Sequence, residues 1–94
     1  MPKYVIMSNL TEEGRKTIID HPERIEEVNQ EMEDMGAEII EQYFLLGEYD
    51  FLTVVEAPSK GTITKIVMEI ASRGSIDTMT LPALDVEELI EDMK

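Results

Sequence analysis

Two mostly hydrophobic runs in the chain flank a single turn. Residues 42–46 and 51–55 are mostly apolar, and they enclose a segment that contains Gly47, Tyr49 and Asp50. Short apolar runs bounded by turn residues are typical of buried strands. This pattern predicts a β-hairpin, with strands at 37–46 and 51–57, around which the rest of the chain is arranged.

Before the hairpin, the pattern predicts a strand followed by two helical segments. Residues 4–10 are rich in aromatic and β-branched side chains, which favour strands. Thr11 is suited to cap a helix, and Pro22 favours a restart after a break at 20–21. Apolar residues then recur at spacings of three and four: Ile25, Val28, Met32 and Met35. Gly36 is the expected stop in a left-handed conformation.

After the hairpin, the pattern predicts a helix, a strand and a short helix. Ser59 is suited to cap the helix, and Arg73-Gly74 to end it. Its apolar stripe consists of Ile63, Ile66, Val67, Ile70 and Ala71. A strand of alternating Thr and apolar residues spans 76–84. The capping-box sequence at 85–88 then opens a helix that contains Leu89, Ile90 and Met93.

The order of elements is β-α-β-β-α-β-α, in a single domain spanning residues 1–94. This order predicts an α+β fold of the ferredoxin-like, split βαβ kind. Right-handed crossovers place both long helices on one face of a four-stranded antiparallel sheet. The other face is then left without a covering layer.

Both faces of the first and third predicted strands are nevertheless mostly apolar. Val5 and Met7 point away from Tyr4 and Ile6, and the strand at 51–57 repeats this pattern. A sheet face in contact with water normally carries polar residues. We therefore expect the same face of a second copy to cover it, because burying apolar surface contributes ~25 cal/mol per Å². The predicted partner is the protein itself, as a dimer or higher homo-oligomer.

The charge balance excludes some classes of partner. The chain of 94 residues has 21 acidic residues against eight Lys and Arg, a net charge of −13. A nucleic-acid binder needs many cations, and so does a protein that binds anionic membranes. Runs of acid at 23–34 and 85–94 are best interpreted as solvated helix faces, in preference to a docking surface for a basic partner. The absence of Cys fits a cytoplasmic location.

Four short segments match one family pattern when taken together. They are Pro2-Lys3-Tyr4-Val5, Asn9-Leu10-Thr11-Glu12-Glu13-Gly14, Gly47-Glu48-Tyr49-Asp50-Phe51 and Val55-Glu56-Ala57-Pro58. In this order and spacing, the chain resembles the GYD-domain family, which is named for the Gly-x-Tyr-Asp turn. The resemblance implies a small prokaryotic protein of ferredoxin-like fold, related in architecture to dimeric α+β barrels. It implies no activity.

The Gly-x-Tyr-Asp turn has a structural and a functional interpretation. In the structural one, Gly47 adopts a positive φ and Asp50 accepts backbone N–H bonds within the turn. Tyr49 then packs its ring and directs its hydroxyl group at a partner. In the functional one, Tyr49 and Asp50 form a donor–acceptor pair at the mouth of a pocket. The structural interpretation is favoured.

Three further polar residues, Asn9, Tyr43 and Thr53, lie on mostly apolar strands. Buried polar groups cost free energy unless they are paired, so these residues are either hydrogen-bonded within the structure or line a cavity. We expect at least two of Asn9, Tyr43, Tyr49 and Thr53 to line one mostly apolar pocket near the hairpin.

Catalytic and metal chemistry have little support in the sequence. His21 is the only imidazole, and its place at a helix break favours a solvent-facing or capping role. No His, Cys or carboxylate spacing is typical of a metal site, and no phosphate-binding loop or nucleophile motif is present. We therefore expect no cofactor, no metal and no catalytic residue.

Two function classes remain open. The first is a non-catalytic homo-oligomeric module that binds a small apolar or aromatic molecule or a protein partner. The alternative is a small cofactor-free monooxygenase- or isomerase-like enzyme of the dimeric α+β barrel type, an analogy of fold alone. The alternative requires Asp50 or His21 to lie inside a closed cavity, where its pKa could be perturbed.

Overall fold

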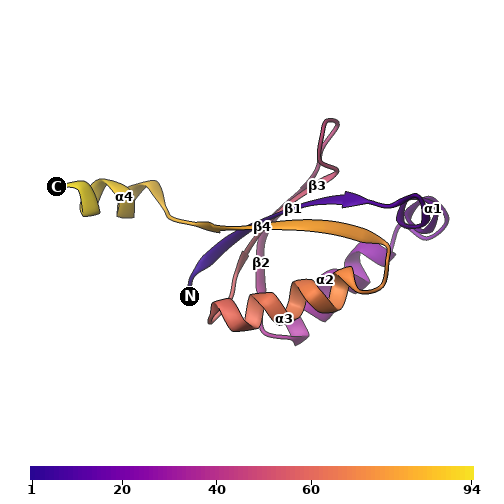
Figure 1. The fold of residues 1–94 in the computed structure, drawn as a ribbon, viewed down its shortest axis with the longest axis horizontal. Helices are drawn as coiled ribbons and strands as arrows, with labels where there is room; N and C mark the ends of the chain where they lie inside the picture. The colour runs from indigo at the N-terminus through magenta and orange to yellow at the C-terminus, as the bar shows by residue number, and fades with distance from the viewer.

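The fold is a four-stranded antiparallel sheet with helices packed against it (Figure 1). The structure, a computed structural model, describes residues 1–94. In chain order the elements are β1 (Lys3–Leu10), α1 (Glu12–Asp20), α2 (Arg24–Asp34), β2 (Glu38–Phe44), β3 (Phe51–Glu56), α3 (Lys60–Ala71), β4 (Ile76–Ala83) and α4 (Val86–Met93). The strands are arranged β2-β3-β1-β4. This confirms the ferredoxin-like α+β fold. No helix is long and apolar enough to cross a membrane.

Two of the predicted helix caps and the predicted break between the first two helices have direct structural counterparts. The Thr11 hydroxyl accepts a hydrogen bond from the Gly14 N–H at the start of α1, and Ser59 caps α3 in the same way. Helix α1 ends at Asp20, with His21 as its C-cap, and α2 begins after a turn that contains Pro22. These caps satisfy backbone donors that the first turn of a helix leaves unpaired.

The hydrophobic core lies between the sheet and the helices α2 and α3. These helices lie on the same side of the sheet (Figure 1). The core consists of Tyr4, Ile6, Met32, Ala37, Val55, Ala57, Ile63, Ile66 and Ile70. Alternation along β1 and β3 sends every second side chain into this core. The apolar stripes predicted for α2 and α3 pack against these strand side chains with Met32, Ile63, Ile66 and Ile70.

The other side chains of the strands form a second apolar surface, which we call the open face. It consists of Val5, Met7, Tyr43, Leu52, Val54, Met79 and Leu81. Two cross-strand rows build it, because Val5 pairs with Val54 and Leu81 while Met7 pairs with Leu52 and Met79. Tyr43, Met79 and Leu81 are 54%, 40% and 44% exposed. The two-faced apolar character expected of the sheet is therefore present.

Two local predictions are wrong. Gly47 does not have a positive φ; only Gly36 and Gly74 do. The predicted capping box at the start of α4 does not form, because the Asp85 carboxylate accepts a hydrogen bond from Lys3 Nζ at 2.8 Å instead of capping the helix. This hydrogen bond raises the pKa of the Lys3 ammonium group.

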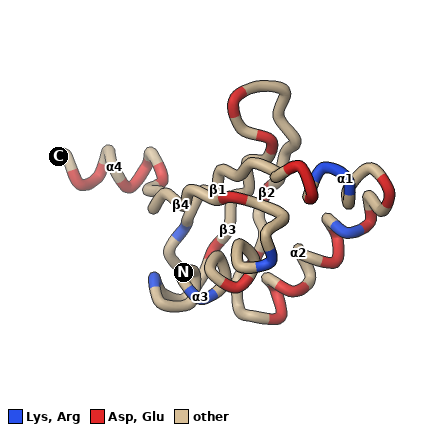
Figure 2. Tube along the Cα trace, turned by 45° about the vertical axis from the view of Figure 1, so that its right-hand side comes forward, with Lys and Arg blue, Asp and Glu red and all other residues tan.

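Helix α4 extends away from the rest of the molecule (Figure 1), and all its residues are exposed. Acidic residues occur along α2 and α4, whereas the few basic residues are scattered over the chain, with Arg24 at the start of α2 (Figure 2). The uneven charge seen in the sequence therefore lies on helix surfaces that contact solvent.

Candidate functional site

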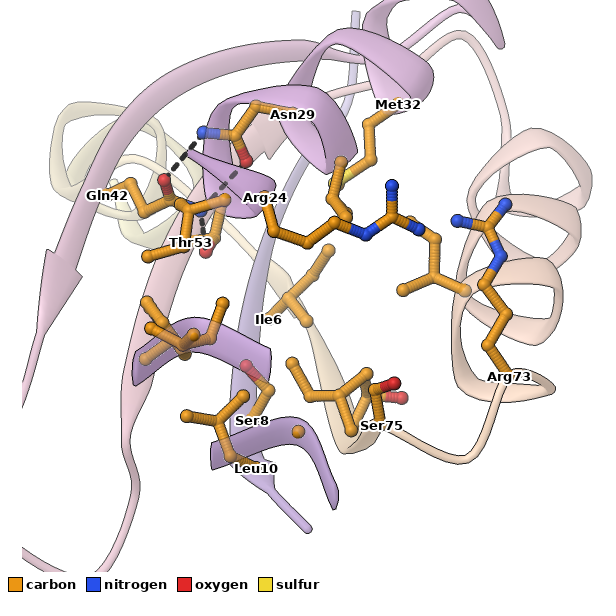
Figure 3. A pocket seen from close by; sticks show the side chains of 18 of the residues that line it. Ile6, Ser8, Leu10, Arg24, Asn29, Met32, Gln42, Thr53, Arg73 and Ser75 are labelled. Atoms are coloured by element: carbon orange, nitrogen blue, oxygen red, sulfur yellow. Dashed lines mark hydrogen bonds between the residues drawn. The ribbon is translucent and has the colours of Figure 1, made fainter. Parts of the chain in front are cut away.

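A cavity of about 120 Å³ lies between the helix-covered face of the sheet and the three helices α1, α2 and α3 (Figure 3). Its apolar walls are formed by Ile6, Leu10, Ile18, Ile25, Val28, Met32, Phe51, Val67, Ile70 and Ile76. Its polar lining includes Ser8, Thr17, Asn29, Gln42, Thr53, Ser75 and Thr78, together with Arg24 and Arg73. An apolar wall with a few placed polar groups is the usual composition of a small-molecule site.

One end of the cavity carries a hydrogen-bonded network of three side chains. The amides of Asn29 and Gln42 bond to each other twice, at 2.7 and 3.1 Å, and Gln42 also donates to the Thr53 hydroxyl at 3.1 Å (Figure 3). This network joins α2 to β2 and β3 and satisfies the buried Thr53. It holds the wall of the cavity in one arrangement.

Two arginines lie at another edge of the cavity, and both are already paired with carboxylates. Arg73 forms ion pairs with Glu31 and Glu69, and Arg24 with Glu27. The hydrogen bond from Arg73 holds the pKa of the Glu31 carboxyl below its usual value. The hydrogen bond to Glu31 likewise raises the pKa of the Arg73 guanidinium group. The positive charge beside the cavity is thus largely compensated.

The residues singled out in the sequence separate into three places. Thr53 alone lines the cavity, so the expectation that two of the four polar residues would share a pocket is not met there. Tyr43 belongs to the open face, and the Tyr49 hydroxyl lies 3.9 Å from Met79 Sδ of that face. Asn9 and Asp50 form hydrogen bonds with each other's strand region at the end of β1.

Asp50 and Asn9 fasten the hairpin to β1. The Asp50 carboxylate accepts the Leu10 N–H at 2.8 Å, and Asn9 Oδ1 accepts the Asp50 N–H at 3.1 Å. Asp50 therefore does accept a backbone N–H, but from another strand and not from within its own turn. Gly47 lies at the exposed tip of this hairpin, with no atom near enough to constrain it.

The cavity contains none of the groups that the enzyme hypothesis requires. Its lining has no carboxylate, imidazole or thiol. His21 is exposed at the end of α1, with Nδ1 3.4 Å from Glu23 Oε1, and Asp50 lies outside the lining. The lining of the cavity therefore offers no side chain that could act as a general base.

The sequence could have indicated Gln42, because Ile40 and Phe44, two positions away on either side, are apolar and an amide in such a row needs a partner. Ser8 carries the same signal on β1. Asn29 lies four residues after Ile25 and three before Met32, which places it beside the apolar stripe of α2. This position distinguishes it from the acidic residues of the same helix and could have indicated it.

Comparison with known proteins identifies the family and supports the fold. The family model described as GYD domain matches residues 4–92. A Thermus thermophilus protein named glutamine synthetase and cystathionine beta-lyase binding protein is 47% identical over 95 residues, covering 100% of both chains.

Among solved structures, MtbAldR is similar with a TM-score of 0.68 and 19% identity over 89% of this chain, and the chain spans 52% of its length. FFRP-DM1 is similar with a TM-score of 0.60 and 26% identity, over 89% of this chain and 100% of its own. These likenesses support the fold, and the family match covers nearly all of the sequence. The chain belongs to the GYD domain family.

Proposed function

We propose that the protein is a non-catalytic interaction module, which pairs with a second copy through the open face and binds other proteins as that assembly. The observation that carries the proposal is the open face itself. Its two apolar rows cross the sheet from β4 to β3, and no helix of the same chain packs on them. Uncovered apolar patches of this kind mark interaction sites.

The borders of the open face favour a protein surface as its cover. Lys3 and Glu56 pair across the strands at one end of the rows, and Asn9 and Asp77 at the other. An apolar centre with a polar and charged rim is the usual anatomy of a protein–protein interface. Two copies related by a twofold axis would each bury the same patch, which is the commonest form of homo-oligomer.

The class of further partner is suggested by the Thermus thermophilus relative. That protein is named for binding glutamine synthetase and cystathionine β-lyase, and it matches this chain along its full length. We extend this to the present protein and propose a metabolic enzyme of one of these two kinds as its partner. The cavity lining, which has no ionisable group other than arginine, supports a binding role over a catalytic one.

Biolayer interferometry with immobilised glutamine synthetase and cystathionine β-lyase from the same organism tests this proposal. The wild-type protein is expected to bind at least one enzyme saturably at micromolar concentration. The variant Met7→Glu, with a charge at the centre of the open face, should bind more weakly, because it disrupts the assembly that binds.

Met68→Glu is the matched control, since Met68 is an exposed residue of α3 and not part of the open face. It should bind as the wild type does. Absence of binding to both enzymes would overturn the proposed partner class, and equal binding by both variants would show that the open face is not needed.

A further inference from the structure

Two hydroxyl groups line the cavity side by side without a hydrogen-bond partner in the protein. Ser8 on β1 is only 4% exposed, and it lies directly across from Thr78 on β4. Both residues line the cavity, and neither side chain forms a hydrogen bond within the chain. Thr78 is partly exposed, and the one fully buried side-chain polar atom without a partner is Thr80 Oγ1, outside the cavity. The Ser8 and Thr78 hydroxyls are therefore open to the cavity, and a guest there would hydrogen-bond to both.

The volume and walls of the cavity restrict what such a guest can be. Protein interiors are close-packed, and a single water needs only about 10–15 Å³ of space measured with a water-sized probe. The cavity of about 120 Å³ is several times larger. Most of the surface of its wall is apolar, for example at Ile25, Val28 and Ile70, and such a surface offers water few of the two to four partners that it needs.

The electrostatics of the cavity restrict the guest further. Arg24 and Arg73 are neutralised by the carboxylates of α2 and α3, so neither is free to hold an anion. The chain as a whole carries a net charge of −13, which repels anions. A cation has no partner either, because no carboxylate lines the cavity. The site therefore suits an uncharged molecule.

We infer that this cavity is a binding site for a small neutral molecule with a branched or cyclic hydrocarbon body of about five carbons and one hydroxyl or carbonyl group. The polar group of the guest bonds to Ser8 and Thr78, whose hydroxyls can both donate and accept. The body fills the space against α2 and α3. Figure 3 shows Ser8 and Ser75 at one end of the cavity and the Asn29–Gln42–Thr53 network at the other. The polar group of the guest therefore belongs at the Ser8 end, because the side chains of the network are already hydrogen-bonded to one another. This site is separate from the open face and does not depend on the proposed protein partner.

Titration of the ¹⁵N-labelled protein with cyclopentanol, followed by amide chemical shifts, tests the inference. Saturable shifts are expected at residues around the cavity, including Ser8, Val28 and Thr78. Thr78→Val keeps the shape of the side chain and removes the hydroxyl, so it should weaken binding about fivefold, the value of one neutral hydrogen bond. Filling the space with Val28→Phe should abolish binding.

Thr80→Val is the matched control on the same strand. The Thr80 hydroxyl is buried without a partner, and Thr80 does not line the cavity. This variant should bind cyclopentanol as the wild type does, and so should the open-face variant Met7→Glu. The pair of threonine variants decides the question even if Val28→Phe does not fold.

Three outcomes would overturn the inference. They are shifts that stay linear in cyclopentanol concentration, equal affinities for Thr78→Val and Thr80→Val, and shifts confined to the open face around Met7 and Leu52. Shifts that stay linear would mean that cyclopentanol does not occupy a specific site and that the cavity holds only water. None of these outcomes bears on enzyme binding, so the proposed function and the cavity site can fail separately.

Discussion

At the scale of single residues, two glycines lie in opposite surroundings. A Cβ atom on Gly14 would collide with the backbone carbonyl oxygen of Ser75, whereas a Cβ on Gly47 would meet nothing within 4 Å. Gly14 thus allows α1 to approach the loop before β4, next to the cavity. Gly47 lies between β2 and β3 in a connection that is long enough to need no left-handed residue.

This contrast predicts opposite effects of the same substitution. Gly47→Ala should leave the urea midpoint unchanged or raise it slightly, because alanine reduces the entropy of the unfolded chain. Gly14→Ala should cost about 1–3 kcal/mol, because backbone atoms must move apart. Urea denaturation of both variants checks this, and a marked loss of stability in Gly47→Ala would show that the turn is constrained after all.

At the scale of elements, the hairpin is held to β1 by side chains as well as by the sheet. Asp50 accepts the N–H of Leu10, and Asn9 accepts the N–H of Asp50. The Asp50 N–H also donates to the Ser8 carbonyl oxygen at 2.9 Å, whereas the Leu10 N–H has the Asp50 carboxylate as its acceptor. The polar residues of the Gly-x-Tyr-Asp turn therefore fix the position of the hairpin relative to the sheet.

Removal of the Asp50 carboxylate should destabilise this junction. Asp50→Ala leaves the partly buried Leu10 N–H without its acceptor, which should cost about 1–3 kcal/mol in free energy of unfolding. Glu48→Ala, in the same turn but exposed, should change stability by less than about 0.5 kcal/mol. Equal urea midpoints for the two variants would contradict the role given to Asp50.

Local patterns account for most of the elements but for little of the cavity. The caps at Thr11 and Ser59 and the break before Pro22 are decided within a few residues, so the sequence predicts them. The partner of Asp50 lies 40 positions away. The pairing of Ser8 with Thr78 depends on the register of β1 and β4, which no local pattern specifies.

At the scale of the whole molecule, one sheet has two apolar faces and only one layer of helices. The helix-covered face contains the core and the cavity, and the open face contains Val5, Met7, Leu52, Val54 and their neighbours on β2 and β4. Alternation along β1 and β3 is visible in the sequence, which is why the second face could be predicted. The expected cover, a second copy, stays a prediction, because one chain's periodicity shows that a face needs a cover but does not specify what covers it.

A second copy is proposed to cover the open face, and light scattering tests this assembly most directly. At micromolar concentration the wild type and Met68→Glu should have a mass at least twice 10.7 kDa. Met7→Glu should shift toward the monomer mass, because a carboxylate buried among apolar side chains at the interface is unpaired. A stable wild-type monomer of 10.7 kDa, or a Met7→Glu variant that remains fully assembled, would contradict the claim.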